Sequence, residues 1–300
     1  MLKLSCFSYK GGAGRTTLAM NIVPFLAEKL GATVKSPLIL VDMDIDSCGI
    51  TYFLHQENSP NMRNYSVQAL FGYSGSIPKE EMITDPEKHI MFNHMCAVGE
   101  YFKFPSRAIL FLPAVPGGAL GANNYDGGKP EQLTDFLEEC DDVGCCGVLF
   151  DSAVGDQLTA RWSNAVADKI ICCMRPTEQF REGTNRFFEK FDQGTARDKT
   201  VIVVPNVVPT DPMDITVDGF DLHYPEYAKE KIKASFADNI KRGVNHYNME
   251  MLEGDSFGVP KVDRFMWHEG ILNSIERLSE NERKALECYR KLAGIICDND

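Results

Sequence analysis

The sequence predicts a single α/β domain in which helices flank a mostly parallel β-sheet. Short apolar runs rich in β-branched residues alternate with stretches of helical periodicity along the 300 residues. Such alternation is typical of parallel strands, because a parallel connection needs a crossover segment that is usually a helix. The first apolar run also leads through a glycine-rich turn into a helical stretch, which is the setting of a phosphate-binding loop.

The predicted strands are mostly apolar throughout, as expected for strands that are buried on both faces. They are residues 2–8, 37–42, 108–112, 146–151, 169–174 and 200–205. The predicted helices are residues 15–30, 131–140, 156–167, 179–192 and 269–295. Leu18, Ile22 and Leu26 recur at helical spacing in the first of them, and Pro24 is expected to kink it.

Two stretches, 53–105 and 207–260, fit this alternation poorly. We interpret both as insertions at the carboxyl edge of the sheet, within one nucleotide-binding domain that spans residues 1–300. Long loops in compact domains are often functional, so these stretches are expected to carry what is individual to the protein.

Composition excludes several classes of protein. A net charge of −12 weighs against broad attraction to nucleic acid or anionic membrane, which depends on Lys and Arg. The ten cysteines include no C-x-x-C pair and favour buried free thiols over disulfides or metal ligands. With neither a long apolar run nor a signal-peptide pattern, the sequence predicts a cytoplasmic protein.

The stretch YKGGAGRTT, residues 9–17, departs twice from the P-loop pattern G-x-x-x-x-G-K-[ST]. Tyr9 stands where the first glycine belongs, and Arg15 replaces the lysine. The glycines between them still permit close approach of the backbone, and successive N–H groups at a helix N-terminus form an anion-binding nest. Phosphate is therefore the expected ligand, the alternative being a glycine-rich turn that binds nothing.

The run from Lys10 to Thr17 resembles the deviant P-loop, K-G-G-x-G-K-[ST]-[ST], of the ParA/MinD-type ATPases. A lysine near the start of the loop, here Lys10, distinguishes that family. Its members lack the first glycine, so Tyr9 agrees with the family pattern and Arg15 alone departs from it.

The resemblance continues beyond the loop. LILVDMDIDSCGIT, residues 38–51, is similar to the family's second strand and switch I, although the usual P-Q-G is missing after its D-x-D. GVLFDSAVGDQLT, residues 147–159, is similar to the Walker B strand and switch II. Residues 167–191 match the next strand, loop and helix. The resemblance thus covers about half of the chain and neither insertion.

The resemblance implies ATP and Mg²⁺ as cofactors. Thr16 would place its hydroxyl on Mg²⁺, Thr17 would bind the α-phosphate, Asp151 would hold Mg²⁺ through water, and Gly155 would lie near the γ-phosphate. A strand-terminal Asp can instead cap a helix. The nucleotide-binding loop residues implied are Gly11, Gly12, Ala13, Gly14, Arg15, Thr16 and Thr17.

The resemblance also assigns catalytic roles. Asp44 would orient the attacking water, because phosphoryl transfer depends on positioning and charge neutralisation. The alternative is a carboxylate bound by loop amides. Asp42, Asp44 and Asp46 alternate, so in an extended chain they share a face and Asp46 is a substitute for Asp44. Lys10 would reach the phosphates bound by a partner subunit in an ATP-dependent homodimer; the alternative is a solvated lysine.

Asn206 follows the last predicted strand in VIVVPNVVP and matches the position near which the family binds adenine. Arg175, Pro176 and Pro209 are the expected neighbours. A local turn is an equally good reason for an Asn at this place.

The function implied is an ATP-dependent dimeric switch that positions or partitions cellular cargo. Hydrolysis is expected to be slow or impaired, because arginine keeps the charge of lysine but not its compact shape, so Arg15 can displace the γ-phosphate. The alternative is a pseudo-ATPase scaffold that binds nucleotide without turnover. A weaker alternative is an ATP-dependent amide-forming enzyme or an iron–sulfur electron donor, although the donors' glycine-flanked cysteine loops are not evident.

The expected partners are a second copy of the chain and an unnamed cargo or activator. A membrane helix like that of MinD-type relatives is not expected, since the C-terminal segment ends in acidic residues and its apolar positions suit core packing. DNA binding through residues 227–247 is not expected either, because Glu230 and Asp238 interrupt their basic run.

Overall fold

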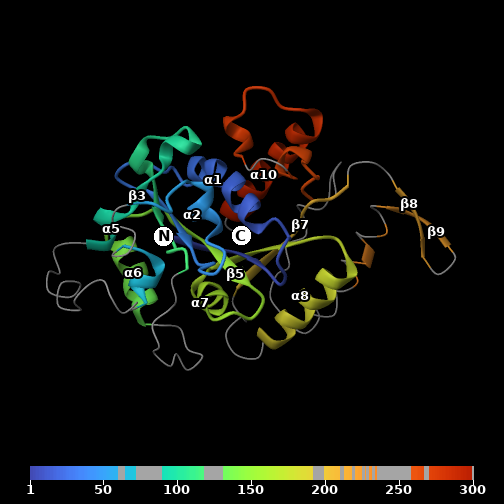
Figure 1. Ribbon diagram of the computed structural model, residues 1–300, viewed down its shortest axis with the longest axis horizontal. Helices are drawn as coiled ribbons and strands as arrows, with labels where there is room; N and C mark the ends of the chain where they lie inside the picture. Colours follow the sequence, from blue (N-terminus) through green and yellow to red (C-terminus); the bar gives the residue numbers. More distant parts are fainter. Residues whose placement is uncertain are drawn as a thin grey trace. The chain divides into compact units, whose positions relative to one another are not determined.

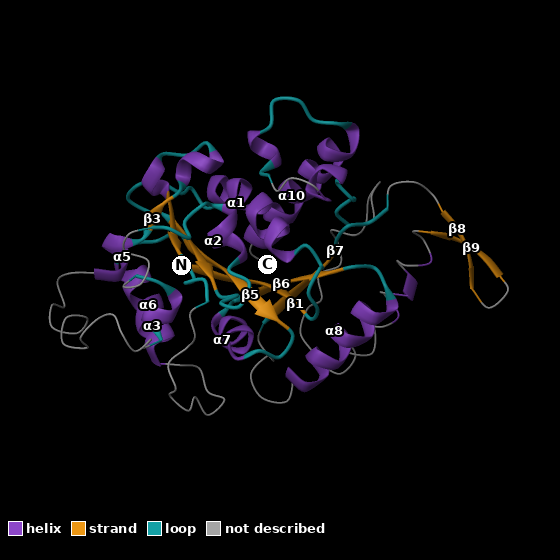
Figure 2. Ribbon diagram, viewed as in Figure 1, coloured by secondary structure: helices purple, strands orange, loops and turns teal. Residues whose placement is uncertain are grey.

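Seven strands of the computed structural model form one sheet in the order β3-β4-β2-β5-β1-β6-β7. Figure 1 shows the chain coloured along its sequence, and Figure 2 draws the strands in orange. They are β1 Leu2–Ser8, β2 Leu38–Asp42, β3 Cys96–Ala97, β4 Ile109–Leu112, β5 Gly147–Val154, β6 Lys169–Met174 and β7 Thr200–Pro205. The structure describes residues 1–59, 65–71, 90–117, 131–191, 199–209, 213–217, 220–224, 227, 230–231, 234, 258–266 and 270–298.

The sheet is mostly parallel, as the sequence predicts. β2 runs parallel to both β4 and β5, and β6 runs parallel to β7. β3 is antiparallel to β4 at the edge of the sheet. Each of the six predicted strands is present, although β5 continues to Val154 rather than ending at 151. The predicted α/β class is therefore confirmed.

Five of the described helices correspond to predicted ones, with shifts of a few residues at most of their ends, and three short helices were not predicted. They are α1 Arg15–Lys29, α2 Gly49–Phe53, α3 Val67–Leu70, α5 Ile90–His94, α6 Glu131–Asp142, α7 Leu158–Val166, α8 Glu178–Phe191 and α10 Glu280–Cys297. Short 3₁₀ turns cover η1 Gly99–Phe102, η2 Ser106–Ala108, η4 Asp263–Met266 and η5 Leu272–Ser274. Pro24 lies within α1, and the kink expected there stays a prediction.

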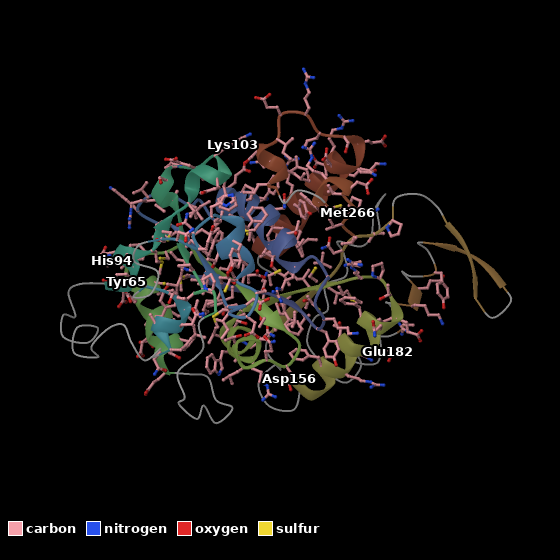
Figure 3. All side chains as sticks on the ribbon, in the orientation of Figure 1. Tyr65, His94, Lys103, Asp156, Glu182 and Met266 are labelled. Atoms are coloured by element: carbon pink, nitrogen blue, oxygen red, sulfur yellow. The ribbon has the colours of Figure 1, made fainter. Side chains whose placement is uncertain are left out.

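Backbone contacts divide the chain into two compact units, which we describe in turn. The first comprises residues 1–5, 27–153 and 157–167. Its core includes the tilted ring pair of Phe71 and Trp162, whose centroids are 4.7 Å apart. The stretch 53–105, predicted to be an insertion, supplies α3, α5 and β3, so part of it extends the sheet. Tyr65 stacks on His94 in the same stretch (Figure 3).

The second unit comprises residues 6–26, 154–156 and 168–300. Neighbouring side chains of β1 face opposite sides of the sheet, because side chains alternate along a strand. Cys6 Sγ donates to the Arg15 carbonyl in α1, and the Phe7 ring stacks on Phe187 of α8. Accordingly, Figure 2 shows α1 and α10 on one side of β6 and β7, with α8 on the other.

The predicted helix over 269–295 is wrong at its start. α10 begins only at Glu280, where Ser279 and Glu282 form a capping box. The preceding segment is held out of the helix by Asn21, which donates to the Gly270 carbonyl and accepts from the Leu272 N–H. This long-range tie is invisible in the local sequence pattern.

Core packing of the α10 face is confirmed. Six apolar residues recur at helical spacing along this face; five of them are buried, and Leu286 is half-buried. The buried five are Ala285, Tyr289, Leu292, Ala293 and Ile296. None of the described helices has both the length and the hydropathy that crossing a bilayer requires.

The stretch 207–260 leaves and re-enters the described fold at neighbouring points. Val208 forms a parallel bridge with Pro260, its N–H donates to the Val259 carbonyl at 3.0 Å, and Lys261 N–H donates to the Val208 carbonyl at 2.7 Å. Between these points, β8 Met213–Val217 and β9 Phe220–Tyr224 form a separate antiparallel hairpin. Most of the basic segment 227–247 lies outside the described residues.

Candidate functional site

The phosphate-binding loop joins β1 to α1 as predicted. Its backbone is left-handed at Gly12 (φ 77°) and at Gly14 (φ 78°), a conformation that other residues adopt only with strain. The Leu18 N–H donates to the Gly14 carbonyl at 2.9 Å, so the helix starts directly after the last loop glycine. The glycines are therefore required by the path of the chain.

Side chains behind the loop hold its carbonyl groups. Ser8 Oγ donates to the Lys10 carbonyl at 3.1 Å, and Arg175 Nε donates to the Gly12 carbonyl at 2.6 Å. The Cys173 thiol donates to the Ala13 carbonyl at 3.3 Å. The carbonyl groups of the loop are thus held by donors from two segments of the chain, the end of β1 and the end of β6.

Peptide planarity turns this arrangement into an anion site. In a trans peptide the carbonyl of one residue and the N–H of the next point in opposite directions. Because the Gly12 carbonyl points to Arg175 and the Ala13 carbonyl points to Cys173, the N–H groups of Ala13 and Gly14 point away from these donors. Several N–H groups turned to one side beside a helix N-terminus form an anion-binding nest.

Tyr9 has a packing role in this structure. A Cβ on Gly183 of α8 would collide with the Tyr9 ring, so the ring lies directly over that glycine. Gly155 also contacts the start of the loop, because its N–H donates to the Ser8 carbonyl at 3.0 Å. The structure therefore places Gly155 beside the start of the loop, and its position near the γ-phosphate stays a prediction.

The predicted side chains of the loop differ in exposure. Arg15 is buried, with 6% of its surface exposed, whereas Lys10, Thr16 and Thr17 are half-buried. These four belong to the same unit as the loop donors. Their predicted roles toward nucleotide and Mg²⁺ stay predictions.

Asn206 lies against the loop rather than apart from it. Its side-chain nitrogen donates to the Ala13 carbonyl at 2.8 Å and to the Gly14 carbonyl at 3.2 Å. The residue is 5% exposed. Sequence reasoning placed Asn206 and Arg175 near the base but missed their contacts with the loop, because those contacts join positions more than 160 residues apart.

The other unit gathers the predicted carboxylates at the ends of β2 and β5. Asp42 and Asp151 are partners in the parallel register, and Met43 N–H donates to the Asp151 carbonyl at 2.9 Å. Asp42 Oδ2 accepts from both the N–H and the hydroxyl of Thr51. Burial raises the pKa of Asp42 to about 7, helped by the charges of Asp151 and Asp44 and opposed by the Thr51 donors.

The alternation of Asp42, Asp44 and Asp46 does not continue as an extended chain. β2 ends at Asp42, and residues 45–47 form a turn, so Asp46 does not share the predicted face. Asp46 is exposed and accepts from Gln157 Nε2 at 3.3 Å. Asp44 remains buried and accepts from the Ser47 N–H at 3.4 Å, a contact of the kind the loop-amide alternative describes.

The carboxylates fit a divalent cation. Asp42 Oδ1 is buried, with no hydrogen-bond partner within reach in the described part of the chain. Its pKa is raised mainly by burial and further by the charges of Asp151 and Asp44, and a cation would neutralise charge at this place. Among the described residues no group of three His, Cys, Asp or Glu is arranged to hold a metal. Mg²⁺ does not need one, because it usually takes one or two carboxylates plus phosphates and waters.

All ten cysteines are free thiols, and six are buried, as predicted.

The fold was compared with known proteins. No protein-family model and no curated protein matches the sequence. Among solved structures, apo McdA from Cyanothece matches with a TM-score of 0.65 at 16% identity, over 97% of this chain and 98% of that one. MinD from Pyrococcus horikoshii, complexed with Mg-ADP, matches with a TM-score of 0.57 at 15% identity, over 99% and 96%.

The chain has the ParA/MinD fold.

A third solved structure with this fold is cobyrinic acid a,c-diamide synthase from Mycobacterium smegmatis, with a bound ATP analog and magnesium. It has a TM-score of 0.56 and 15% identity, and the match covers 98% of this chain and 93% of the synthase. The ParA/MinD fold predicted from three motifs is therefore confirmed, and it extends over nearly the whole chain rather than the half in which the motifs lie.

Proposed function

We propose that this protein is a cytoplasmic, ATP-dependent dimeric switch of the ParA/MinD type that positions or partitions cellular cargo. The observation that carries the proposal is the loop whose carbonyls accept from Ser8, Arg175 and Asn206. We infer that this turns the N–H groups of Ala13, Gly14 and Arg15 toward the phosphates of a nucleotide. Two proteins of the same fold were solved with Mg-ADP and with an ATP analog and magnesium, which supports nucleotide as the ligand.

In this proposal each group of residues at the site has a separate role in binding the nucleotide or in its hydrolysis. The loop N–H groups bind the phosphates, and the Thr17 hydroxyl binds the α-phosphate. Thr16 and, through water, Asp151 would hold Mg²⁺, which supplies charge neutralisation on the phosphates. Asp44 would orient the attacking water by accepting a hydrogen bond from its O–H, because phosphoryl transfer depends on the position of the nucleophile.

Slow or impaired hydrolysis follows from Arg15. A buried guanidinium keeps the positive charge beside the loop but is larger and more rigid than the lysine of the family pattern. Binding depends mainly on the backbone and is preserved, whereas in-line attack requires accurate placement of the γ-phosphate.

Dimerisation is assigned to Lys10. Its side chain is half-buried at the start of the loop and belongs to the position that distinguishes the ParA/MinD-type P-loop. We propose that it neutralises phosphates bound by a second copy of the chain, so that ATP stabilises the dimer.

The competing proposal is a pseudo-ATPase scaffold, which is favoured by the same residue, Arg15. The experiment that separates the two is ATP turnover measured beside equilibrium ATP affinity, with and without Mg²⁺. Affinity with slow turnover supports the switch, and affinity with no turnover supports the scaffold. If the folded protein binds no ATP, both proposals are wrong.

Gly12→Val is the matched test of the loop. A Cβ at this position would meet no atom within 4 Å, so the variant perturbs the φ of 77° rather than the packing. A β-branched residue resists that conformation, and the nest is expected to distort. ATP binding should be lost while the circular dichroism spectrum is kept. Unchanged affinity in a folded variant would remove the loop from the site.

A further inference from the structure

The turn after β7 carries a buried amide and a strained residue directly behind the loop. Asn206 directs its side-chain N–H₂ group at two neighbouring carbonyls, at 2.8 Å on Ala13 and 3.2 Å on Gly14. The next residue, Val207, has a φ of +58°. For a β-branched side chain this left-handed conformation is a genuine outlier.

The surroundings of Val207 hold it in that conformation. On one side the Asn206 N–H donates to the Met174 carbonyl at 2.8 Å. On the other side Val208 exchanges hydrogen bonds with Val259 and Lys261. Strain of this kind persists only where neighbouring contacts over-determine the backbone, and it clusters at functional positions.

Gly14 is shaped to this contact. A Cβ there would lie 2.6 Å from Asn206 Nδ2 and 3.6 Å from Val207 Cγ2. The close approach of the amide therefore requires a glycine at position 14, in addition to its positive φ. The loop and the turn fit each other across 192 residues of sequence.

The chemistry of the contact identifies what it does. Two carbonyl oxygens at hydrogen-bond distance accept from an amide nitrogen, and an oxygen in its place would repel both. Fixing the carbonyls of Ala13 and Gly14 also fixes the opposite direction of the N–H groups of Gly14 and Arg15, because each peptide is planar.

We propose that Asn206, held in place by the strained Val207, is a positioning residue that orients the Gly14 and Arg15 N–H groups toward the phosphates of the bound nucleotide. It therefore acts on polyphosphate, whichever base is attached. This inference rests on the proposed nucleotide binding, and it differs from the adenine contact that the sequence resemblance implies for Asn206.

The test uses Mg²⁺-tripolyphosphate, which has no base, beside Mg²⁺-ATP and Mg²⁺-GTP in isothermal titration calorimetry on the full chain. Asn206→Asp keeps the shape of the side chain but removes its donors. It should weaken all three ligands by the same factor, ~10-fold or more, and leave the ATP-to-GTP affinity ratio unchanged. Unchanged tripolyphosphate affinity with a fall in ATP affinity would establish base recognition instead and overturn the proposal.

Wild-type behaviour separates this inference from the proposed function. A wild-type chain that binds neither ATP nor tripolyphosphate contradicts the proposed function and with it this inference. A wild-type chain that binds both, with no change in Asn206→Asp, contradicts the inference alone.

Gln68→Ala is the matched control for a loss of fold. Gln68 is another buried amide that ties distant segments together, because it donates to the Val115 carbonyl at 3.0 Å and accepts from the Val115 N–H at 2.8 Å, and neither contact involves residues 9–17. It should lower the melting temperature and leave tripolyphosphate affinity within about 2-fold, because its contacts stabilise the fold and not the nest. A loss of tripolyphosphate affinity as large as that in Asn206→Asp would show that general destabilisation explains both losses.

A double-mutant cycle tests the contact itself. Gly14→Ala should weaken tripolyphosphate strongly alone but by a smaller factor in the Asn206→Ala background, because the clash with Nδ2 is then gone. Additive effects of the two changes would contradict the proposed contact.

Discussion

In the proposed switch, the rate of ATP turnover depends on Arg15. It begins α1 and is buried beside the loop, so its guanidinium occupies space where the family pattern has a slimmer ammonium. Arg15→Lys should raise ATP turnover by ~10- to 100-fold with much less change in affinity, since misplacement by about 1 Å costs ~10²-fold in rate. Phosphate release measured beside ATP affinity checks this.

Arg175→Lys is its matched control, because Arg175 is a second arginine at the same loop, bound to the Gly12 carbonyl. It should not raise turnover. If Arg15→Lys binds ATP and stays inactive with Asp44 and Asp151 in place, hydrolysis is lost for another reason and the scaffold is the better proposal.

Asp42 makes the metal-free protein sensitive to pH. Its pKa of about 7 in the folded state lies above the ordinary value of 3.8, so the folded state keeps a proton that the unfolded chain has released. The free energy of unfolding should therefore fall as pH rises from about 4 to 7 and level off above, with a slope of at most about 1.4 kcal/mol per pH unit from this group.

Urea unfolding at several pH values in Mg²⁺-free buffer measures that slope. Asp42→Asn should flatten it and stabilise the protein at pH 8. Asp46→Asn removes a nearby exposed carboxylate and should leave the slope in place. If Asp42→Asn keeps the wild-type slope of the free energy of unfolding against pH, another titratable group causes the pH dependence.

Among the elements, α10 depends on its first turn. Ser279 accepts from the Glu282 N–H, and the Glu282 carboxylate accepts from the Ser279 N–H at 2.7 Å. Ser279→Ala should lower the free energy of unfolding by ~1 kcal/mol, the usual cost of losing an N-cap. Chemical denaturation measures it. Lys284→Ala, on the exposed side of the same helix, should change it by less than ~0.5 kcal/mol, and an equal loss in both would argue against the cap.

At this scale the sequence predicts most of what the structure contains. Strands buried on both faces have a strong apolar signal, and all six are found. The start of α10 is missed because Asn21, far away in the chain, holds the residues before it. β3 is missed because two residues carry no periodicity. β8 and β9 had a readable signal, an Asp-Gly pair between two alternating apolar runs, which is typical of a hairpin.

The candidate site shows the same division. The glycines, threonines and carboxylates follow a local spacing and could be found from the sequence. The hydrogen bonds that Arg175, Cys173 and Asn206 donate to the loop could not be found in this way, because these residues reach the loop only once β6 and β7 lie beside β1.

For the whole molecule, the sharpest prediction concerns Lys10. Lys10→Ala should leave ATP binding by the monomer nearly intact and abolish ATP-dependent dimerisation, because the proposed target of its charge is the nucleotide of the other subunit. Light scattering with and without ATP measures the change. Lys3→Ala, on β1 of the same chain, is the control and should still dimerise. If Lys10→Ala still dimerises normally with ATP, the proposed role of Lys10 in the dimer is wrong, and the alternative of a solvated lysine holds.

The bridge between Val208 and Pro260 has a consequence for how this protein diversifies. The chain leaves the end of β7 and returns to it at neighbouring residues, which are joined by hydrogen bonds of 3.0 and 2.7 Å. The entropy of closing a flexible loop rises by only about 0.6 kcal/mol for each doubling of its length. We therefore expect that a change in the length of the stretch between these two residues costs the free energy of unfolding little, as long as the bridge that joins its two ends is kept.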